Sequence, residues 1–177
     1  MLSDFNIAMG QRLGALNIDP YNTELLGPCS YDVTLGDGYT FLNYPHQIDP
    51  LNPPKEDKYI SFNSPQCILR PKEFLLGHTE EVVTLGDNVA AQLEGKSSLG
   101  RLGLLVHVTA GFIDPGFSGQ ITLELHNVSE NPILLTAGMP IGQLVFHQLD
   151  TRPQKTYQNT GRYNKQMGPT ISKGVKL

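Results

Sequence analysis

The sequence predicts an all-β barrel or sandwich with a short helix at its N-terminus and an extended tail at its C-terminus. Eighteen glycines and thirteen prolines divide its 177 residues into short segments, which is typical of many short strands joined by tight turns. Several segments, such as ITLELHN (121–127), alternate apolar and polar residues, and this period of two indicates a half-buried strand. No helical period of useful length follows residue 14, except at SSLGRLG (97–103). These three observations favour one β-rich domain.

The N-terminal part is predicted to form one helix and one strand pair. Ser3 is placed to cap a helix over residues 4–13, because its hydroxyl can accept a hydrogen bond from a free backbone N–H of the first turn. Three apolar side chains of this helix are available for burial: Phe5, Ile7 and Leu13. The segments SYDVTLG (30–36) and YTFL (39–42) are separated by Asp37-Gly38, a dipeptide that favours a tight turn between paired strands.

The middle of the chain alternates between predicted strands and turns. Residues 43–58 hold four prolines and little apolar content, so we expect an irregular surface loop there. Turn formers such as Pro71-Lys72, Pro115-Gly116 and Asn131-Pro132 separate the later segments. The strand segments are YISF (59–62), CILR (67–70), EFLLGHT (73–79), EEVVTL (80–85), VAAQLEG (89–95), LLVHVTA (104–110), QITLELHN (120–127), ILLTA (133–137) and IGQLVFHQL (141–149).

Composition and the N-terminus predict a soluble, cytoplasmic protein with no membrane partner. No apolar run approaches the roughly 18 residues that a spanning helix needs. The start, MLSDFNIAMG, lacks the basic residues and the apolar core of a signal peptide. Cys29 and Cys67 stand alone, with neither metal-ligand spacing nor the pattern of a disulfide framework.

The charged residues divide the chain into an acidic body, residues 1–150, and a basic tail, residues 151–177. The tail carries six lysines and arginines and no acid, whereas the body carries seven basic and seventeen acidic residues, a net charge of −10. A basic tail on an acidic body suits a small anionic ligand better than nucleic acid, which needs a broad basic face. The alternative is a solvated C-terminal extension.

One polar cluster could bind an anion. The segment EGKSSLGRLG (94–103) places Lys96, Ser97, Ser98 and Arg101 beside glycines. Cations, hydroxyls and accessible backbone N–H groups form a plausible anion cradle, although an ordinary polar turn would have the same composition. The order of glycine and lysine is not that of a P-loop.

Two carboxylates could carry acid–base chemistry. Asp114 ends one predicted strand, next to a turn at IDPGFSG (113–119), and Glu124 lies on the polar face of the next strand. Their spacing leaves open whether they meet at one ligand or never meet, and Glu124 could simply face solvent. The sequence also lacks the Pro-Cys-x-x-Cys with which zinc deaminases hold their metal. Hydrolytic chemistry would therefore depend on carboxylates, hydroxyls and a bound cation.

A longer segment resembles a known family. LEGKSSLGRLGLLVHVTAGFIDPGFSGQITLELHN (93–127) is similar to the central signature of the dCTP deaminases, members of the trimeric dUTPase superfamily. SYDVTLG (30–36), LRPKEFLLGHTEEVVTLGDNVAAQLEG (69–95), AGMPIGQLVF (137–146) and RYNKQMGP (162–169) follow the order expected of that family. The resemblance therefore covers nearly the whole chain.

The resemblance implies a distorted β-barrel of the dUTPase type, a homotrimer, and active sites built where subunits meet. Glu124 would be the general base and acid of deamination. Ser97 and Arg101 would lie near the base and the phosphates, donated by a neighbouring subunit. Asp114 would hold the deoxyribose 3′-hydroxyl, and Ala110 with its neighbouring backbone would read the pyrimidine edge.

The same resemblance assigns the phosphate contacts. The tail would close over the triphosphate, with Mg²⁺ bridging the phosphate oxygens. Residues 1–150 would be the barrel domain and residues 151–177 the closing tail. The implied phosphate ligands are Lys96 and Ser98 together with Tyr157, Arg162 and Gln166 from the tail. Arg162 stands where many relatives have lysine.

Two features favour a dUMP-forming enzyme. Gly111-Phe112 after the Thr-Ala dipeptide, and Gln143 in IGQL, resemble the bifunctional members of the family and the dUTPases. Asp114 is then the candidate that orients water at the α-phosphorus. Three alternatives stay open: a deaminase that releases dUTP, a plain dUTPase, and a non-catalytic trimer that binds nucleotides. No nucleic-acid partner is expected.

Overall fold

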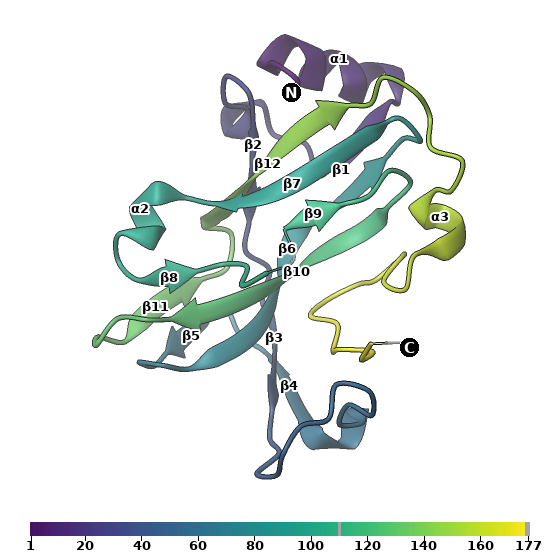
Figure 1. The fold of residues 1–177 in the computed structure, drawn as a ribbon. Helices are drawn as coiled ribbons and strands as arrows, with labels where there is room; N and C mark the ends of the chain where they lie inside the picture. Colours follow the sequence, from purple (N-terminus) through teal and green to yellow (C-terminus); the bar gives the residue numbers. More distant parts are fainter. Residues whose placement is uncertain (110, 176–177) are drawn as a thin grey trace.

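Three β-sheets surround one apolar core (Figure 1). The computed structural model describes residues 1–109 and 111–175. The six-stranded sheet has the order β4-β3-β6-β10-β8, with β1 also beside β6, and the four-stranded sheet has the order β2-β12-β7-β9. A third sheet pairs β11 with β5. Buried side chains from all three sheets form one cluster, which includes Tyr31, Leu69, Leu93, Leu123 and Phe146.

The elements have the following bounds. The six-stranded sheet contains β1 (Leu16–Asp19), β3 (Gly38–Leu42), β4 (Tyr59–Asn63), β6 (Phe74–Leu85), β8 (Leu104–Leu105) and β10 (Ser118–Asn127). The four-stranded sheet contains β2 (Tyr31–Thr34), β7 (Val89–Gly95), β9 (Phe112–Ile113) and β12 (Pro140–Gln148), and the small sheet contains β5 (Gln66–Leu69) and β11 (Ile133–Thr136). The helices are α1 (Asp4–Leu13), α2 (Ser97–Gly100) and α3 (Tyr157–Thr160), with 3₁₀ turns at Thr23–Leu25 and Glu56–Lys58.

The predicted N-terminal helix is confirmed as α1. The Ser3 hydroxyl accepts a hydrogen bond from the backbone N–H of Asn6, as expected of an N-cap residue. Its burial is only partly as expected: Ile7 is fully buried, whereas Phe5 and Leu13 are 70% and 74% exposed. Because α1 contacts the body along one narrow stripe, two of the three predicted core side chains remain on the surface.

The central strand β10 has the predicted alternation. Ile121, Leu123 and Leu125 are buried, while Thr122 and Glu124 between them are half-buried. β10 pairs antiparallel with β6 along most of its length, and Glu124 lies opposite Leu76. The polar face of β10 is therefore neither in the core nor free in solvent, since another part of the chain covers it.

The predicted pairing of 30–36 with 39–42 is wrong. β2 pairs with β12, whereas β3 pairs with β4 and β6, so the two segments belong to different sheets. The cause is His78 on β6: its backbone carbonyl accepts from the Gly36 N–H at 2.8 Å, and its Nε2 accepts from the Gly38 N–H at 3.1 Å. A Cβ at Gly36 would lie 2.2 Å from that ring, so the chain crosses between sheets where glycine permits it.

Several other boundaries differ from the prediction. Segments 73–79 and 80–85 form one continuous strand, β6, because no turn residue interrupts them. Of the segment 104–110, β8 takes only Leu104–Leu105. The short helix α3 is missing from the prediction, since four residues are too few to display a helical period. The predicted loop 43–58 is confirmed as irregular, apart from its closing 3₁₀ turn.

Across the described residues, the strands form three separate sheets rather than one closed barrel. The six-stranded sheet ends at β4 and at β8 and does not return upon itself. Among residues 1–109 and 111–175, no helix is long and apolar enough to cross a membrane.

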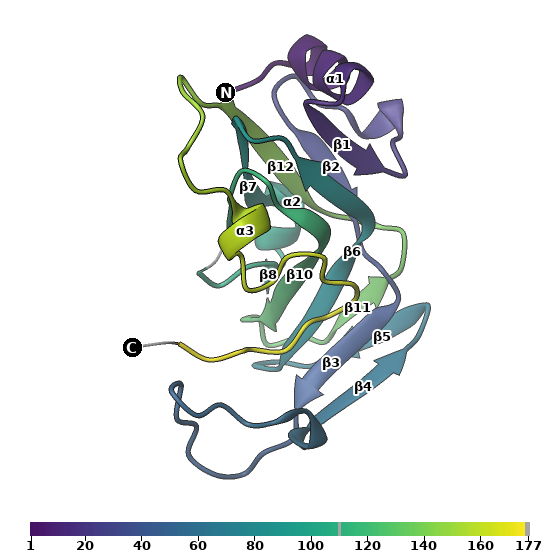
Figure 2. The same cartoon turned by 90° about the vertical axis from the view of Figure 1, so that its right-hand side faces the viewer.

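The tail runs along β10 instead of extending into solvent. Figure 2 shows it, in yellow, leaving α3 and crossing the body toward the β3–β4 hairpin. The Lys165 N–H donates to the Ser118 carbonyl at 2.6 Å, and the Gln120 N–H donates to the Gln166 carbonyl at 3.0 Å. Farther along, the Val175 N–H donates to the Pro50 carbonyl at 2.9 Å, which joins the tail to the 43–58 loop. The tail thus covers the polar face of β10.

Candidate active site

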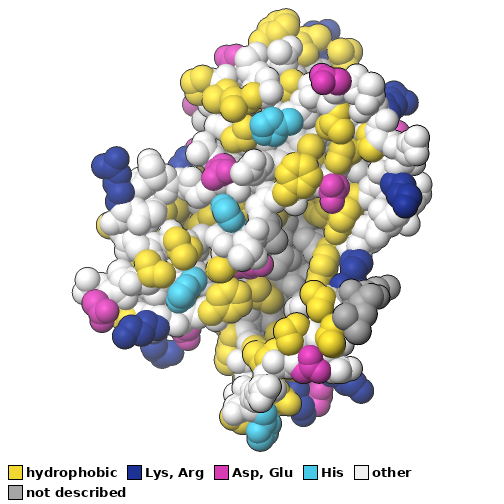
Figure 3. All heavy atoms as spheres, viewed as in Figure 1, with side chains coloured by type: hydrophobic (Ala, Val, Ile, Leu, Met, Phe, Trp, Pro, Cys, Tyr) yellow, Lys and Arg dark blue, Asp and Glu magenta, His cyan; other side chains and the backbone are white. Residues whose placement is uncertain are grey.

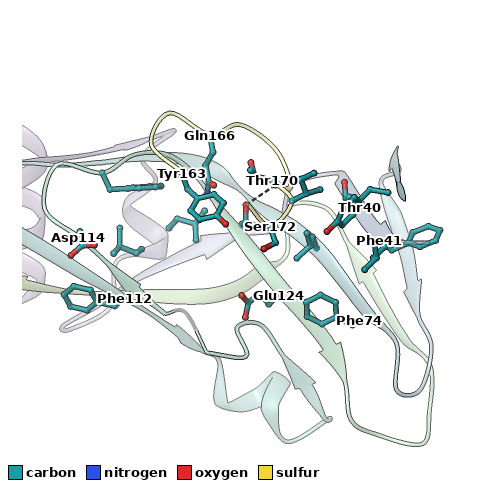
Figure 4. A pocket seen from close by; sticks show the side chains of 18 of the residues that line it. Thr40, Phe41, Phe74, Phe112, Asp114, Glu124, Tyr163, Gln166, Thr170 and Ser172 are labelled. Carbon is teal, nitrogen blue, oxygen red and sulfur yellow. Dashed lines mark hydrogen bonds between the residues drawn. The ribbon is translucent and has the colours of Figure 1, made fainter. Parts of the chain in front are cut away.

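A cavity of about 540 Å³ lies between β10, the tail and the β3–β4 hairpin. On the face drawn in Figure 3, the surface is hollowed and the hollow is bordered by hydrophobic side chains. The cavity is lined mainly by apolar and aromatic groups, among them Phe41, Phe74 and Tyr163, while Glu124 and Asp114 bring carboxylates to it (Figure 4). An apolar cavity with a few convergent polar groups is the usual form of a small-molecule site.

Glu124 enters this cavity from the middle of β10, where the alternation of the strand directs it away from the core. Its Oε2 accepts hydrogen bonds from the backbone N–H groups of Val108 and Thr109, at 2.8 and 3.3 Å. Two backbone donors on one oxygen fix the orientation of the carboxylate, and bonds to a charged acceptor are stronger than neutral ones. The other oxygen, Oε1, is the end available to a ligand.

Asp114 reaches the cavity from the turn after β9. Its backbone carbonyl accepts from the Phe117 N–H at 3.2 Å, and Gly116 within that turn has φ +85°, which favours glycine. The exposed Asp114 side chain lines the main cavity and also a neighbouring one of about 400 Å³, to which His147 and Lys155 contribute. Local turn geometry therefore sets the position of this carboxylate.

Tyr157 and Gln166 line the cavity from the tail. The Tyr157 ring packs against Phe117 with centroids 5.8 Å apart, and its hydroxyl accepts from the Tyr163 N–H at 3.2 Å. The Gln166 Nε2 donates to the Gln120 carbonyl at 2.8 Å. Both predicted tail residues are therefore held in place by contacts with the body or within the tail.

Arg162, also predicted to bind phosphate, is engaged within the tail. Its guanidinium donates to the backbone carbonyls of Lys173 and Gly174. The Lys173 ammonium donates a hydrogen bond to the Arg162 backbone carbonyl. Its Nζ lies 5.1 Å from the centroid of the Tyr163 ring. These contacts join the two ends of the loop formed by residues 162–174.

The remaining predicted residues form a second group, which we call the α2 patch: Lys96, Ser97, Ser98 and Arg101 at α2, with Gln143 on β12. None of them lines the cavity described above. Ser97, Ser98 and Arg101 are exposed, and Lys96 forms an ion pair with Asp32 on β2. Gln143 lies opposite Asp32 in the β2–β12 ladder. One chain thus separates the predicted residues into a cavity group and a patch group.

The cavity group contains Asp114, Glu124, Tyr157 and Gln166. Ala110, which was also predicted to belong to the site, lies outside the described residues. The sequence prediction missed the apolar lining, because Phe74 and Tyr59 read as ordinary strand residues. It also missed the backbone donors of Val108 and Thr109, since backbone groups leave no mark in a sequence. Asp32 could have been found as a carboxylate on a predicted strand.

Within the described residues, no group of three or more His, Cys, Asp or Glu side chains is arranged to hold a metal ion. Carboxylates and phosphate oxygens are the kinds of ligand that Mg²⁺ prefers, and Asp114 and Glu124 bring carboxylates to the cavity.

One known family matches most of this chain. The sequence model of a family described as dCTP deaminase-like matches residues 1–149. The chain belongs to this family. A "dCTP deaminase, dUMP-forming" from Clavibacter michiganensis subsp. michiganensis is 48% identical over 181 residues, covering 98% of this chain and 90% of the relative. A protein of the same name from Mycobacterium avium is 46% identical over 186 residues, covering 99% and 96%.

Two solved structures have a similar fold. A 2′-deoxycytidine 5′-triphosphate deaminase from Agrobacterium tumefaciens aligns with a TM-score of 0.66 and 20% identity, over 83% of this chain and 48% of that one. A dUTPase from phage phi11 of S. aureus aligns with a TM-score of 0.51 and 14% identity, over 79% and 94%. The predicted β-rich fold of dUTPase type is confirmed to that extent.

Proposed function

We propose that this protein removes the amino group from C4 of dCTP and then releases pyrophosphate, so that dUMP is formed. The observation that carries the proposal is Glu124: a carboxylate on a largely apolar cavity wall, oriented by two backbone N–H groups. The curated relatives named dUMP-forming dCTP deaminases support the choice of substrate and product.

In the deamination step, Glu124 acts as general base and then as general acid. It takes a proton from a water molecule, whose oxygen bonds to C4, and passes that proton to N3. Glu124 then transfers the proton of the new C4 hydroxyl to the amine, so the C4–N4 bond breaks, ammonia leaves and a carbonyl remains. Such general acid–base catalysis contributes about 10²–10⁴-fold. The Ser97 hydroxyl donates to the developing oxyanion.

In the second step, water attacks the α-phosphorus in line with the leaving pyrophosphate. Asp114 orients this water and also binds the 3′-hydroxyl of the sugar. Mg²⁺ held by the phosphates would supply positive charge that offsets the negative charge of the leaving pyrophosphate. A related phage phi11 dUTPase coordinates a structural Mg(II) ion, which supports a link between this fold and magnesium. Lys96, Ser98 and Gln143 contact the phosphates.

A homotrimer completes each site. The separation of the cavity group from the α2 patch within one chain supports this, because Glu124 and Ser97 must act on the same base. A neighbouring subunit would bring its patch to the cavity, and the sheets of residues 1–150 would assemble as distorted barrels. Residues 151–177 would form the covering tail, with Tyr157, Arg162 and Gln166 toward the phosphates and Ala110 at the pyrimidine edge.

Product analysis tests this proposal. The protein is incubated with dCTP and Mg²⁺, nucleotides are separated by chromatography, and pyrophosphate is assayed. We expect dUMP and pyrophosphate in equal amounts, little free dUTP, and loss of dUMP formation when EDTA removes the cation. Accumulation of dUTP would assign a one-step deaminase, and hydrolysis of dUTP alone would assign a dUTPase. Absence of all turnover would leave a nucleotide-binding trimer.

A further inference from the structure

Gln143 lies between two carboxylates on one face of the four-stranded sheet. It is directly opposite Asp32 on β2 and directly opposite Glu94 on β7. Residues directly opposite in antiparallel strands point to the same face of a sheet. The amide of Gln143 therefore stands in a row with two acidic side chains, and the Lys96 ion pair with Asp32 lies at the same place.

Ser30 fixes one end of that amide. Its hydroxyl donates to the Gln143 Oε1 at 3.0 Å, between two half-buried residues that are 113 positions apart in the sequence. Ser30 is itself held, because its backbone carbonyl accepts from the Gly27 N–H at 2.8 Å. Ser30 thus belongs to a turn, closed by this backbone hydrogen bond, that lies immediately before β2.

The two ends of an amide side chain are chemically different. The oxygen only accepts hydrogen bonds, whereas Nε2 only donates. With Oε1 turned to Ser30, Nε2 is directed away from it and donates no hydrogen bond among residues 1–109 and 111–175. Asp32 and Glu94 favour the same orientation, since an ionised carboxylate repels an amide oxygen and accepts from an amide nitrogen.

We infer that Ser30 is a positioning residue that holds Gln143 with its donor end toward the phosphate chain of the nucleotide. The inference rests on the proposed function, in which Gln143 contacts phosphate. Without Ser30 the amide can rotate and present Oε1, an acceptor, to phosphate oxygens that can only accept. The strand that follows Ser30 also carries Asp32, which holds Lys96, so one segment orients two donors of the α2 patch.

A double-mutant cycle tests this role. Calorimetry measures binding of the non-hydrolysable α,β-imido analogue of dUTP, with Mg²⁺, to the full-length protein and to three variants: Ser30→Ala, Gln143→Ala and the double variant. We expect Ser30→Ala to weaken binding about 3- to 10-fold, the usual size of one net hydrogen bond. In the Gln143→Ala background, the same change should have no further effect. Ser30→Thr keeps the hydroxyl and should retain the affinity.

Two further variants keep the test decisive. Ser64 lies between β4 and β5, and among the described residues its hydroxyl bonds only to the backbone of Gln66. The Ser64→Ala variant should therefore bind like the parent. Gln143→Glu has no donor, so it should bind more weakly than Gln143→Ala even if Ser30→Ala fails to fold. Parent-like binding by Ser30→Ala, or an equal loss in both backgrounds, would overturn the inference.

Turnover separates this outcome from failure of the proposed function. A parent protein that binds the analogue but neither deaminates dCTP nor hydrolyses dUTP contradicts the proposed function and leaves the cycle interpretable. A parent that turns over dCTP while the cycle is additive contradicts only the role of Ser30. A parent that does not bind the analogue overturns both.

Discussion

The cavity and the α2 patch differ in almost every physical respect. The cavity is bordered by β10 and the tail, is largely apolar, and contains the half-buried Glu124. The patch is open, and its Ser97 and Arg101 are exposed. α2 lies on the opposite side of the body from α3 and the tail (Figure 1). Each region holds part of what the proposed reaction needs, and neither holds all of it.

The difference follows from the chemistry that each region would perform. A general base works in a site from which bulk water is excluded, because fixed donors and a low dielectric there replace the solvent. Groups that bind a triphosphate stay hydrated until the ligand arrives. Until then, the ion pair with Asp32 stabilises the charge of Lys96. In a symmetric oligomer, the patch of one copy can lie against the cavity of another copy, so that the two regions form one site.

The largest effect is expected from Glu124→Gln, which tests the cavity alone. Glutamine keeps the size of the side chain and can still accept from the Val108 and Thr109 N–H groups, but it takes no proton from water. Deamination of dCTP should therefore fall by about 10²–10⁴-fold, measured as ammonia release under saturating substrate. A rate near that of the parent would make Glu124 an ordinary strand residue.

Asp114→Asn is the matched control for that change. Hydrolysis of supplied dUTP requires nothing of C4, so Glu124→Gln should affect it less than it affects deamination. Asp114→Asn should instead impair both reactions, because the proposed sugar contact serves both. Equal losses of both reactions in the Glu124 variant would remove its assignment to deamination.

Removal of the tail tests the cover of the cavity. A protein ending at Asp150 loses the wall formed by Tyr163 and Gln166, yet keeps the β6–β10 ladder. We expect folding to persist by circular dichroism while turnover falls by about a hundredfold or more, the size of effect that misplacement of a substrate produces. Unchanged turnover would show that the tail covers the cavity without contributing to the reaction.

The positions of the strands are easier to predict from the sequence than the pairing between them. The alternation along β10 and the cap of α1 are local, and both are confirmed. The pairing of 30–36 with 39–42 failed because His78, from a distant strand, separates the two segments. Local patterns carry no information about such long-range contacts, so the turn signal at Asp37-Gly38 predicts a hairpin that does not form.

The site shows the same limit. Residue types and the family resemblance selected Glu124 and Asp114, and both line one cavity. They did not indicate that Oε2 of Glu124 is bound by two backbone N–H groups, or that Arg162 is engaged by carbonyls of its own tail. Those contacts depend on how the loop before β9 and the tail fold back, which three-dimensional packing decides.

Subunit complementation tests whether the two regions belong to different copies. Glu124→Gln and Arg101→Ala proteins, each inactive alone, are mixed in equal amounts, dissociated and reassembled. If each site joins the cavity of one subunit to the patch of another, about a quarter of randomly mixed sites regain both intact groups. Activity should rise to about that fraction of the parent rate. No recovery in mixed assemblies confirmed by mass would place both groups in the same subunit.

The smallest effect concerns a second glutamate, Glu81, which contrasts with Glu124. Glu81 on β6 is 1% exposed and accepts hydrogen bonds from the Thr34 backbone N–H and hydroxyl. Burial raises the pKa of its carboxyl, and the bonds from Thr34 offset this only in part. Unlike Glu124, it lines neither cavity. Its protonation should therefore affect stability and not turnover.

The sign of that effect follows from linkage. Because the folded state binds the Glu81 proton more tightly than the unfolded state, the stability it confers is complete below the ordinary glutamate pKa of about 4.3. That stability is lost as the pH rises through the higher pKa of the folded state. Thermal unfolding of the parent and of Glu81→Gln, followed from pH 4 to pH 8, should thus show a fall in the parent that the glutamine variant lacks. Parallel curves would contradict a raised pKa, and a matching change in dCTP turnover would contradict the separation of Glu81 from the cavity.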